Sequence, residues 1–143
     1  MNLRRAARAI SHLYDEAIAS SGLKVTQFSL LRAVARNEPV AISVLAGEME
    51  LDRTTLARNL APLERERLVV RSAGRDRRIT EVRLSAAGRA AIQRALPLWK
   101  TAQAQVRKQL GREQVAQLNA IAARAGAALV PAASLKSAQV EIG

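Results

Sequence analysis

Arginine is the residue type in this sequence best suited to chemistry, and its side chains gather in two short segments. One segment runs from Arg53 to Asn59 and combines two arginines with two threonines; the other runs from Gly74 to Arg78 and contains three arginines. A guanidinium group binds phosphate oxygens, or the O6 and N7 atoms of guanine, through paired hydrogen bonds, whereas a lysine ammonium acts as a point charge. These two segments therefore predict contacts with a nucleic acid.

The charge of the whole chain also indicates an anionic partner. Its 143 residues include 23 Lys and Arg against 12 Asp and Glu, a net charge of +11, and 19 of the cations are arginine. The excess is uneven, because residues 1–52 are neutral overall while residues 53–83 carry +5 and residues 84–143 carry +6. A neutral first third followed by a basic middle favours a localised binding surface over general solubility.

The composition excludes several other kinds of chemistry. The chain has no cysteine, which rules out disulfides, thiolate catalysis, cysteine-bound metals and thiol-based redox sensing. One histidine, His12, is too little for a histidine metal site or a Ser-His-Asp relay. No phosphate-binding loop, zinc-protease motif or nucleophile elbow is present. We therefore expect no enzyme activity, no cofactor and no metal, and the short apolar runs predict no membrane span.

Apolar periodicity predicts a mainly helical chain. Aromatic residues make up only 2%, against 29 Ala and 18 Leu, which favours closely packed helices over a β-sandwich. The first helix is expected over residues 3–20, and its arginine-rich start is interpreted as part of the fold rather than as a transit peptide. N-caps are expected at Thr26, Ser43, Asp52 and Ser85. Further helices are expected to end before Pro39, near Met49, at Leu68, at Leu110 and at residue 130. In the helix that ends at Leu68, Pro62 is expected to separate a DNA-facing part from a packing part.

The two helices around residues 43–68 form a helix-turn-helix pattern, because the turn Glu50–Asp52 joins them and its last residue can cap the second helix. Their second helix has two distinct faces. Spacing at 100° per residue predicts one buried face and one exposed face. The buried face consists of Leu56, Leu60 and Leu63. The exposed face and its flanks, which suit the major groove of DNA, consist of Arg53, Thr54, Thr55, Arg58 and Asn59.

A β-hairpin is expected directly after this motif. Strands are predicted over residues 68–71 and 79–84, with an arginine-rich loop between them. A helix-turn-helix followed by such a hairpin predicts a winged helix. We expect Arg75, Arg77 and Arg78 to neutralise phosphates, one of them entering the minor groove, and Asp76 to brace an arginine by a charge-assisted hydrogen bond.

Several motifs resemble those of the MarR family of bacterial transcription regulators. Residues 76–78 followed by residues 82–88 are similar to the family's wing signature, D-x-R…L-[ST]-x-x-G. Upstream, residues 26–31 (TQFSLL) resemble its second helix, and residues 51–64 resemble its recognition helix. The motifs occur in the expected order over about residues 3–130.

The resemblance implies a domain organisation and roles for single residues. It implies one MarR-like domain over 1–143, with a winged helix-turn-helix lobe over 24–88 and dimerisation helices and a tail over 1–22 and 89–143. It places Arg78 in the minor groove with Asp76 as its brace, and Arg53, Thr54, Thr55 and Arg58 along the major groove. The sequence departs from the family at two positions. Arg67 stands where many relatives have glycine, so a left-handed backbone there would cost about 1 kcal/mol, and Ser85 replaces the commoner threonine.

The resemblance also implies partners. Family members commonly respond to small aromatic or phenolic acids, and His12, Tyr14 and Trp99 are the candidate pocket residues; the alternative is that each serves ordinary helix or core packing. A homodimer is expected as well, since the terminal helices carry apolar faces that one winged lobe cannot cover.

We therefore expect a cytoplasmic, nucleoid-associated regulator, most simply a repressor, that binds double-stranded DNA as a homodimer on a pseudo-palindromic operator. The alternative is an architectural DNA-binding protein that tolerates many sequences.

Overall fold

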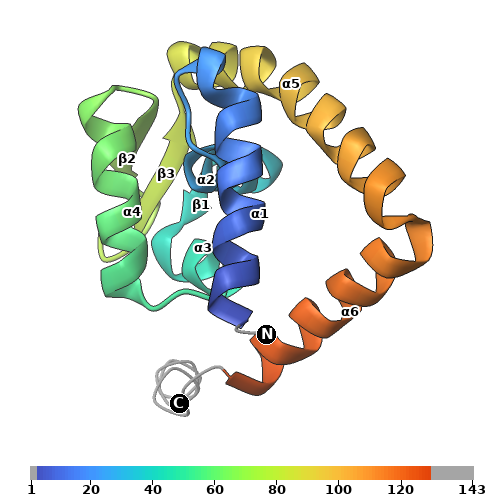
Figure 1. Cartoon of the computed structure of the whole chain (residues 1–143). Helices are drawn as coiled ribbons and strands as arrows, with labels where there is room; N and C mark the ends of the chain where they lie inside the picture. Colours follow the sequence, from blue (N-terminus) through green and yellow to red (C-terminus); the bar gives the residue numbers. More distant parts are fainter. Residues whose placement is uncertain (1–2, 130–143) are drawn as a thin grey trace. The chain divides into compact units, whose positions relative to one another are not determined.

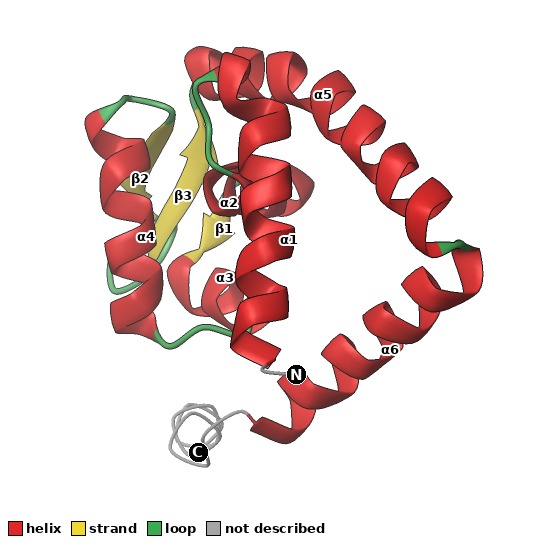
Figure 2. Ribbon diagram, viewed as in Figure 1, coloured by secondary structure: helices red, strands yellow, loops and turns green. Residues whose placement is uncertain are grey.

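Helices dominate the structure, a computed structural model that describes residues 3–129, and a small antiparallel sheet lies among them (Figure 1, Figure 2). The winged-helix fold class predicted from the sequence is confirmed. The predicted tail, residues 131–143, lies outside the described residues. In chain order the elements are α1 (Leu3–Ile18), the short 3-10 helix η1 (Ala19–Ser21), α2 (Val25–Asn37), β1 (Val40–Ala41), α3 (Ile42–Glu48), α4 (Arg53–Arg65), β2 (Val69–Ala73), β3 (Thr80–Leu84), α5 (Ala86–Leu110) and α6 (Arg112–Leu129).

Contacts divide the chain into two units, residues 1–103 and 104–143. The first unit contains α1 to α4, the sheet and most of α5. The second contains the end of α5 and α6, which are separated by Gly111 with φ of 85°. The helix end predicted at Leu110 is confirmed, and α5 continues through Pro97.

The hydrophobic core of the first unit is assembled from amphipathic faces of its helices and from the inner side of the sheet. Alternation along β3 places Val82 and Leu84 inward. The largest side chains with less than 2% exposure are Phe28, Ile18, Leu31, Leu45, Leu56, Leu60, Leu63, Val34 and Val82. This core joins α2, α3 and α4 to the sheet, so the proposed helix-turn-helix and hairpin share one support.

The sheet has three strands in the order β1-β3-β2, one more than the sequence predicted. Strands β2 and β3 form the expected hairpin, with Val69 opposite Leu84 and Ala73 opposite Thr80. The additional strand β1 pairs with β3 through Val40 opposite Val82. A strand of two residues has too few positions to show an alternating pattern, which is why the sequence did not reveal it.

Two of the four predicted N-caps are wrong. Helix α2 begins at Val25, one residue before Thr26, because Asp15 of α1 accepts a hydrogen bond from the Val25 backbone N–H at 2.6 Å. Helix α3 begins at Ile42, before Ser43, and its N-cap residue is Ala41. The predicted caps at Asp52 and Ser85 are correct.

The end of α4 shows two further departures. The helix passes through Pro62 and ends at Arg65, three residues before the predicted end, and buried leucines lie on both sides of the proline. Pro62 therefore does not divide a DNA-facing part from a packing part. Arg67 adopts a left-handed backbone with φ of 57°, the conformation that the absence of glycine makes costly.

Candidate nucleic-acid interface

The start of α4 is held by Asp52. Its Oδ1 accepts a hydrogen bond from the Thr55 backbone N–H at 2.7 Å, and its Oδ2 accepts one from the Thr55 hydroxyl at 2.8 Å. These bonds hold the pKa of Asp52 below its ordinary value of 3.8, and the backbone bond from Thr55 has the larger effect. The ionised carboxylate also lies at the positive end of the helix dipole, so it stabilises the first turn of α4.

The two faces of α4 are those predicted from the sequence. Leu56, Leu60 and Leu63 are fully buried. On the other side, four of the five side chains that the sequence predicts to contact DNA are exposed, namely Arg53, Thr54, Arg58 and Asn59. Thr55 differs from them, since it is half-buried and its hydroxyl is bonded to Asp52.

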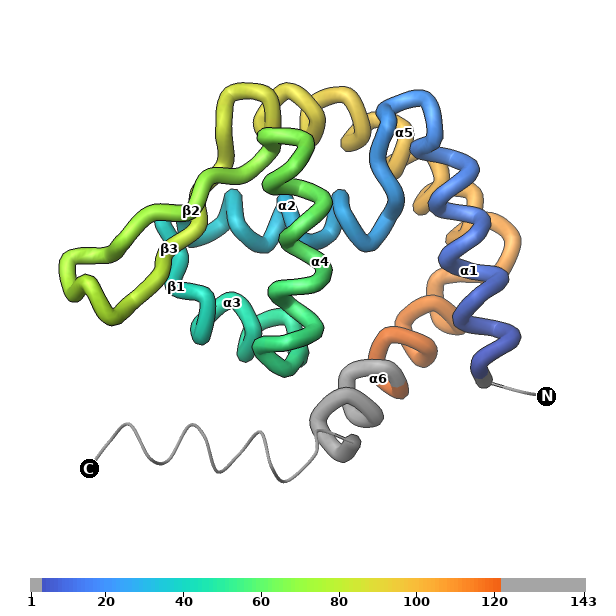
Figure 3. The backbone as a smooth tube through the Cα atoms, turned by 90° about the vertical axis from the view of Figure 1, so that its left-hand side faces the viewer, coloured from blue at the N-terminus to red at the C-terminus, as the bar shows by residue number. Residues whose placement is uncertain are grey.

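The hairpin β2–β3 extends away from α2, α3 and α4, as the view in Figure 3 shows. Arg75, Arg77 and Arg78 are all exposed at its tip. The tip is shaped by backbone bonds, one from Gly74 N–H to the Ile79 carbonyl at 2.8 Å and one from Ile79 N–H to the Asp76 carbonyl at 2.9 Å.

Asp76 acts on the backbone of the tip. Its Oδ1 accepts a hydrogen bond from the Arg78 backbone N–H at 2.9 Å. This bond fixes the direction in which the chain leaves the turn, and therefore the point from which the Arg78 side chain starts. The hydrogen bond at Asp76 comes from the Arg78 main chain, whereas the sequence predicted a charge-assisted bond between Asp76 and an arginine.

The base of the hairpin is packed tightly against the start of α5. Ser85 Oγ donates to the Arg67 carbonyl at 2.7 Å and accepts from the Gly88 N–H at 3.0 Å. A Cβ atom on Gly88 would lie 2.1 Å from the Leu68 carbonyl oxygen, a distance that no real contact allows. The serine and the glycine of the L-[ST]-x-x-G motif thus join the residues just before β2 to α5. An ion pair between Glu64 and Arg71 links α4 to β2 itself.

Two of the three candidate pocket residues lie together. The rings of Tyr14 and Trp99 are stacked with centroids 6.4 Å apart, and Phe28 lies 6.1 Å from Trp99. The Arg32 guanidinium carbon lies 5.3 Å from the Trp99 ring centroid and 5.7 Å from that of Phe28. His12 lies apart from them.

His12 points elsewhere because residues two apart on a helix face different directions, and its side chain is 74% exposed and 3.2 Å from Glu16. Arg32, the arginine of this cluster, was not predicted from the sequence. The signal that could have revealed it is the spacing of Phe28 and Arg32, which lie one helical turn apart on the same face.

Residues 3–129 contain no group of His, Cys, Asp or Glu that could hold a metal ion. None of their helices combines the length and the hydrophobicity that a membrane span requires.

Comparisons with known proteins agree with this geometry. The profile described as MarR family matches residues 21–79. The DNA complex of the Mycobacterium tuberculosis transcriptional regulator MosR is 41% identical over 85% of this chain and 92% of that chain, with a TM-score of 0.73. The transcriptional repressor CouR bound to a 23-mer DNA duplex is 27% identical over 85% and 87%, with a TM-score of 0.76. A probable transcriptional regulator from Pseudomonas aeruginosa is 28% identical over 85% and 92%, with the same TM-score. No curated protein matches the sequence.

Proposed function

Because the chain belongs to the MarR family of DNA-binding transcriptional regulators, we propose that it represses transcription by binding a specific operator as a homodimer. One observation carries the proposal. The exposed polar face of α4 and the exposed three-arginine tip of the hairpin are built on one shared hydrophobic core. A helix that enters the major groove beside a wing that enters the minor groove is a common geometry of specific DNA recognition.

In this proposal α4 reads the bases. Arg58 binds a guanine edge through its paired donors, while Arg53 and Asn59 contact the groove at the flanks of the exposed face. Thr54 is small enough to allow close approach. Thr55 contributes its methyl group, since its hydroxyl is occupied by Asp52.

The wing supplies the second contact. Arg78 enters the minor groove, where the narrow walls raise the negative potential that attracts a guanidinium group. Arg75 and Arg77 neutralise the flanking phosphates. Asp76 keeps its place as the brace of the tip, through its bond to the Arg78 backbone.

The homodimer is supported by apolar surface on both terminal helices. In the single chain, Ile10 and Leu13 of α1 are 46% and 36% exposed, and Leu118 and Ile121 of α6 are 47% and 52% exposed. A second copy would remove this surface from water. Two-fold symmetry then presents two α4 helices to a pseudo-palindrome with half-sites about 34 Å apart.

The aromatic cluster supports a small aromatic acid as effector. The stacked rings of Tyr14 and Trp99 offer a flat apolar surface, and the Arg32 guanidinium beside them can pair with a carboxylate. Tyr14 already donates a hydrogen bond to Gln103 of α5, so a ligand that competes for this hydroxyl would act on the link between α1 and α5.

Selection from a random-sequence duplex library tests the proposal. We expect the purified protein to sediment as a dimer and to select an inverted repeat with half-sites about ten base pairs apart. Its affinity for the selected duplex should exceed that for a scrambled duplex by about a thousandfold or more. A monomer, or enrichment of no sequence, would contradict the proposal, and enrichment of no sequence with tight binding would support the architectural alternative.

A further inference from the structure

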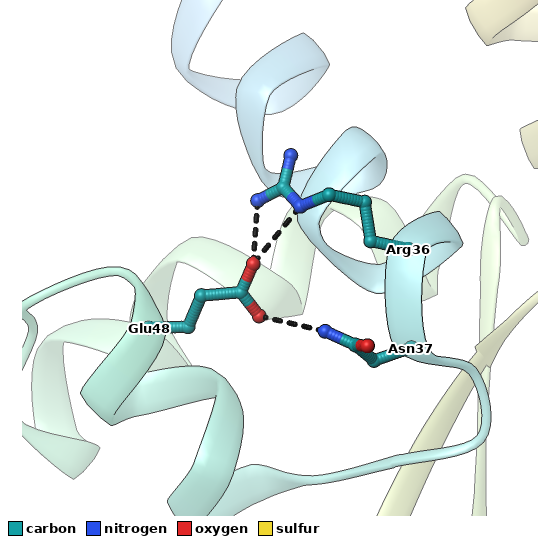
Figure 4. A network of polar contacts seen from close by, with 3 residues as sticks. All are labelled: Arg36, Asn37 and Glu48. Carbon is teal, nitrogen blue, oxygen red and sulfur yellow. Dashed lines mark hydrogen bonds and ion pairs between the residues drawn. The ribbon is translucent and has the colours of Figure 1, made fainter.

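Three consecutive residues at the end of α2 reach toward both elements that we assign to DNA. They are Arg36 and Asn37, which end the helix, and Glu38, which follows it. The first two contact Glu48 at the end of α3, beside the turn that leads into α4 (Figure 4). The third contacts the base of the wing. We call this segment, residues 36–38, the α2 brace.

The first arm of the α2 brace is a network around one carboxylate. Arg36 donates to Glu48 Oε1 from Nε at 3.0 Å and from Nη2 at 2.6 Å, and Asn37 Nδ2 donates to the other oxygen at 3.3 Å. The hydrogen bond from Arg36 holds the pKa of Glu48 below its ordinary value of 4.5, so this arm is ionised at neutral pH. Because Glu48 is the last residue of α3, the arm attaches the helix-turn-helix to α2 just before the chain turns into α4.

The second arm extends the sheet by a side chain. Strand β1 pairs Val40 with Val82, and the same antiparallel register continued backwards brings Glu38 opposite Leu84. Pro39 lies between and has no N–H to donate, so the backbone ladder cannot continue. Instead, Glu38 Oε2 accepts the Leu84 N–H at 2.6 Å.

The other oxygen of Glu38 is also engaged. It forms an ion pair with Arg89 in the first turn of α5, and the Glu38 side chain is only 16% exposed. The carboxylate therefore holds the last residue of β3 and the start of α5 together. The first of these segments belongs to the wing, and the wing base packs against the second.

We propose that the α2 brace sets the distance and angle between α4 and the wing, and that Glu38 and Glu48 are positioning residues for operator specificity. The inference rests on the function proposed above. Its physical basis is that both arms start from adjacent residues at the end of α2. The turn before α4 and the base of the wing are therefore both attached to the same short segment. Loss of either arm lets one element shift relative to the other while every arginine of the interface remains.

The test compares Glu38→Ala and Glu48→Ala with Glu66→Ala, which removes an exposed carboxylate at the end of α4. All three changes raise the net charge by one, so any general gain in attraction to DNA is common to them. The quantity measured is the ratio of affinities for the duplex selected by the wild type and for a scrambled duplex. We expect the ratio to fall by about tenfold in the two brace variants and to stay at the wild-type value in the control.

A second measurement separates positioning from simple destabilisation. Repeating the selection with each variant should relax the preference at the central bases read by α4 for Glu48→Ala, and at the flanking bases read by the wing for Glu38→Ala. The salt dependence of binding should not change, since the phosphate-binding arginines are retained. Equal losses on both duplexes, or one uniform loss of preference across the site, would overturn the inference.

The conservative variants decide the matter if an alanine variant does not fold. Glu38→Gln keeps an oxygen that can accept the Leu84 N–H but loses the ion pair with Arg89. Glu48→Gln keeps one acceptor oxygen for Arg36 but replaces the oxygen that Asn37 contacts by an NH2 group, which cannot accept. Each should lower the ratio by less than its alanine counterpart, by about threefold. A wild-type ratio in both would refute the inference while leaving the proposed function intact, whereas failure of the wild type to select any sequence would refute both.

Discussion

Leu56, Leu60 and Leu63 hold α4 in the hydrophobic core, whereas the wing tip, residues 74–79, is shaped by hydrogen bonds among its own residues. Close packing resists displacement in every direction, while a few exposed hydrogen bonds open at low cost. The two proposed DNA contacts therefore differ in kind. The helix presents a rigid face suited to reading bases, and the tip can adapt its arginines to the local width of a groove.

The base of the wing is closely packed, unlike its tip. Gly88→Ala, which disturbs this packing, should lower the free energy of unfolding more than any other substitution proposed below. The added methyl carbon would lie 2.1 Å from the Leu68 carbonyl oxygen, which belongs to the backbone and cannot move aside alone. We expect a loss of about 2 kcal/mol or more in the free energy of unfolding, measured by urea titration.

Gly47→Ala is the matched control. Gly47 lies inside α3, and a Cβ atom there would meet nothing within 4 Å. Alanine is the better helix former, so this variant should gain about 0.5–1 kcal/mol. Equal free energies of unfolding for the two alanine variants would contradict this expectation. They would mean that the base of the wing does not depend on the close contact between Gly88 and the Leu68 carbonyl.

The rigid side of the comparison is tested by Arg58→Ala. Arg58 is exposed on α4, so its loss should leave stability unchanged and remove about 1–3 kcal/mol of binding to the selected duplex, with a smaller loss on scrambled DNA. Electrophoretic mobility shifts on both duplexes measure the difference. Arg58→Lys keeps the charge but not the paired donors, so it should recover the non-specific part alone. Equal losses on both duplexes would demote Arg58 to a phosphate contact.

The same contrast explains which features were predictable from the sequence. The buried face of α4 follows from the spacing of its leucines, and the tip of the wing follows from one run of residues, so both are local patterns. The cap at Thr26 was predicted wrongly because a tertiary contact decides where α2 begins; Asp15, ten residues upstream, accepts the hydrogen bond of its first N–H. The cap at Ser43 was wrong because Ala41 pairs with Glu81 in the sheet and α3 starts directly after it. The α2 brace was invisible for the same reason, since its partners lie far along the chain.

The adaptable side is tested by Arg78→Ala. The Arg78 side chain is exposed. The backbone N–H of residue 78, which donates a hydrogen bond to Asp76, is retained in the variant. We expect binding to the selected duplex to weaken by about tenfold with an unchanged thermal midpoint. Arg94→Ala, which removes an exposed arginine of α5, controls for the loss of one charge. If Arg78→Ala bound the selected duplex as tightly as the wild type, the proposed minor-groove contact of the wing would be wrong, and α4 alone would recognise the operator.

The smallest expected effect concerns the charge that holds the start of α4. Asp52→Asn keeps a capping oxygen for the Thr55 N–H but lacks the carboxylate whose pKa the two Thr55 bonds lower. A carboxyl group whose pKa is lower in the folded state stabilises the fold above its ordinary value of 3.8, and this contribution is lost as the pH falls through the lowered value. The thermal midpoint of the variant should therefore be lower by a few degrees at neutral pH, and the gap should close in acid. A gap that did not depend on pH would mean that the charge contributes nothing to the first turn, so that the rigidity of α4 would rest on its buried leucines alone.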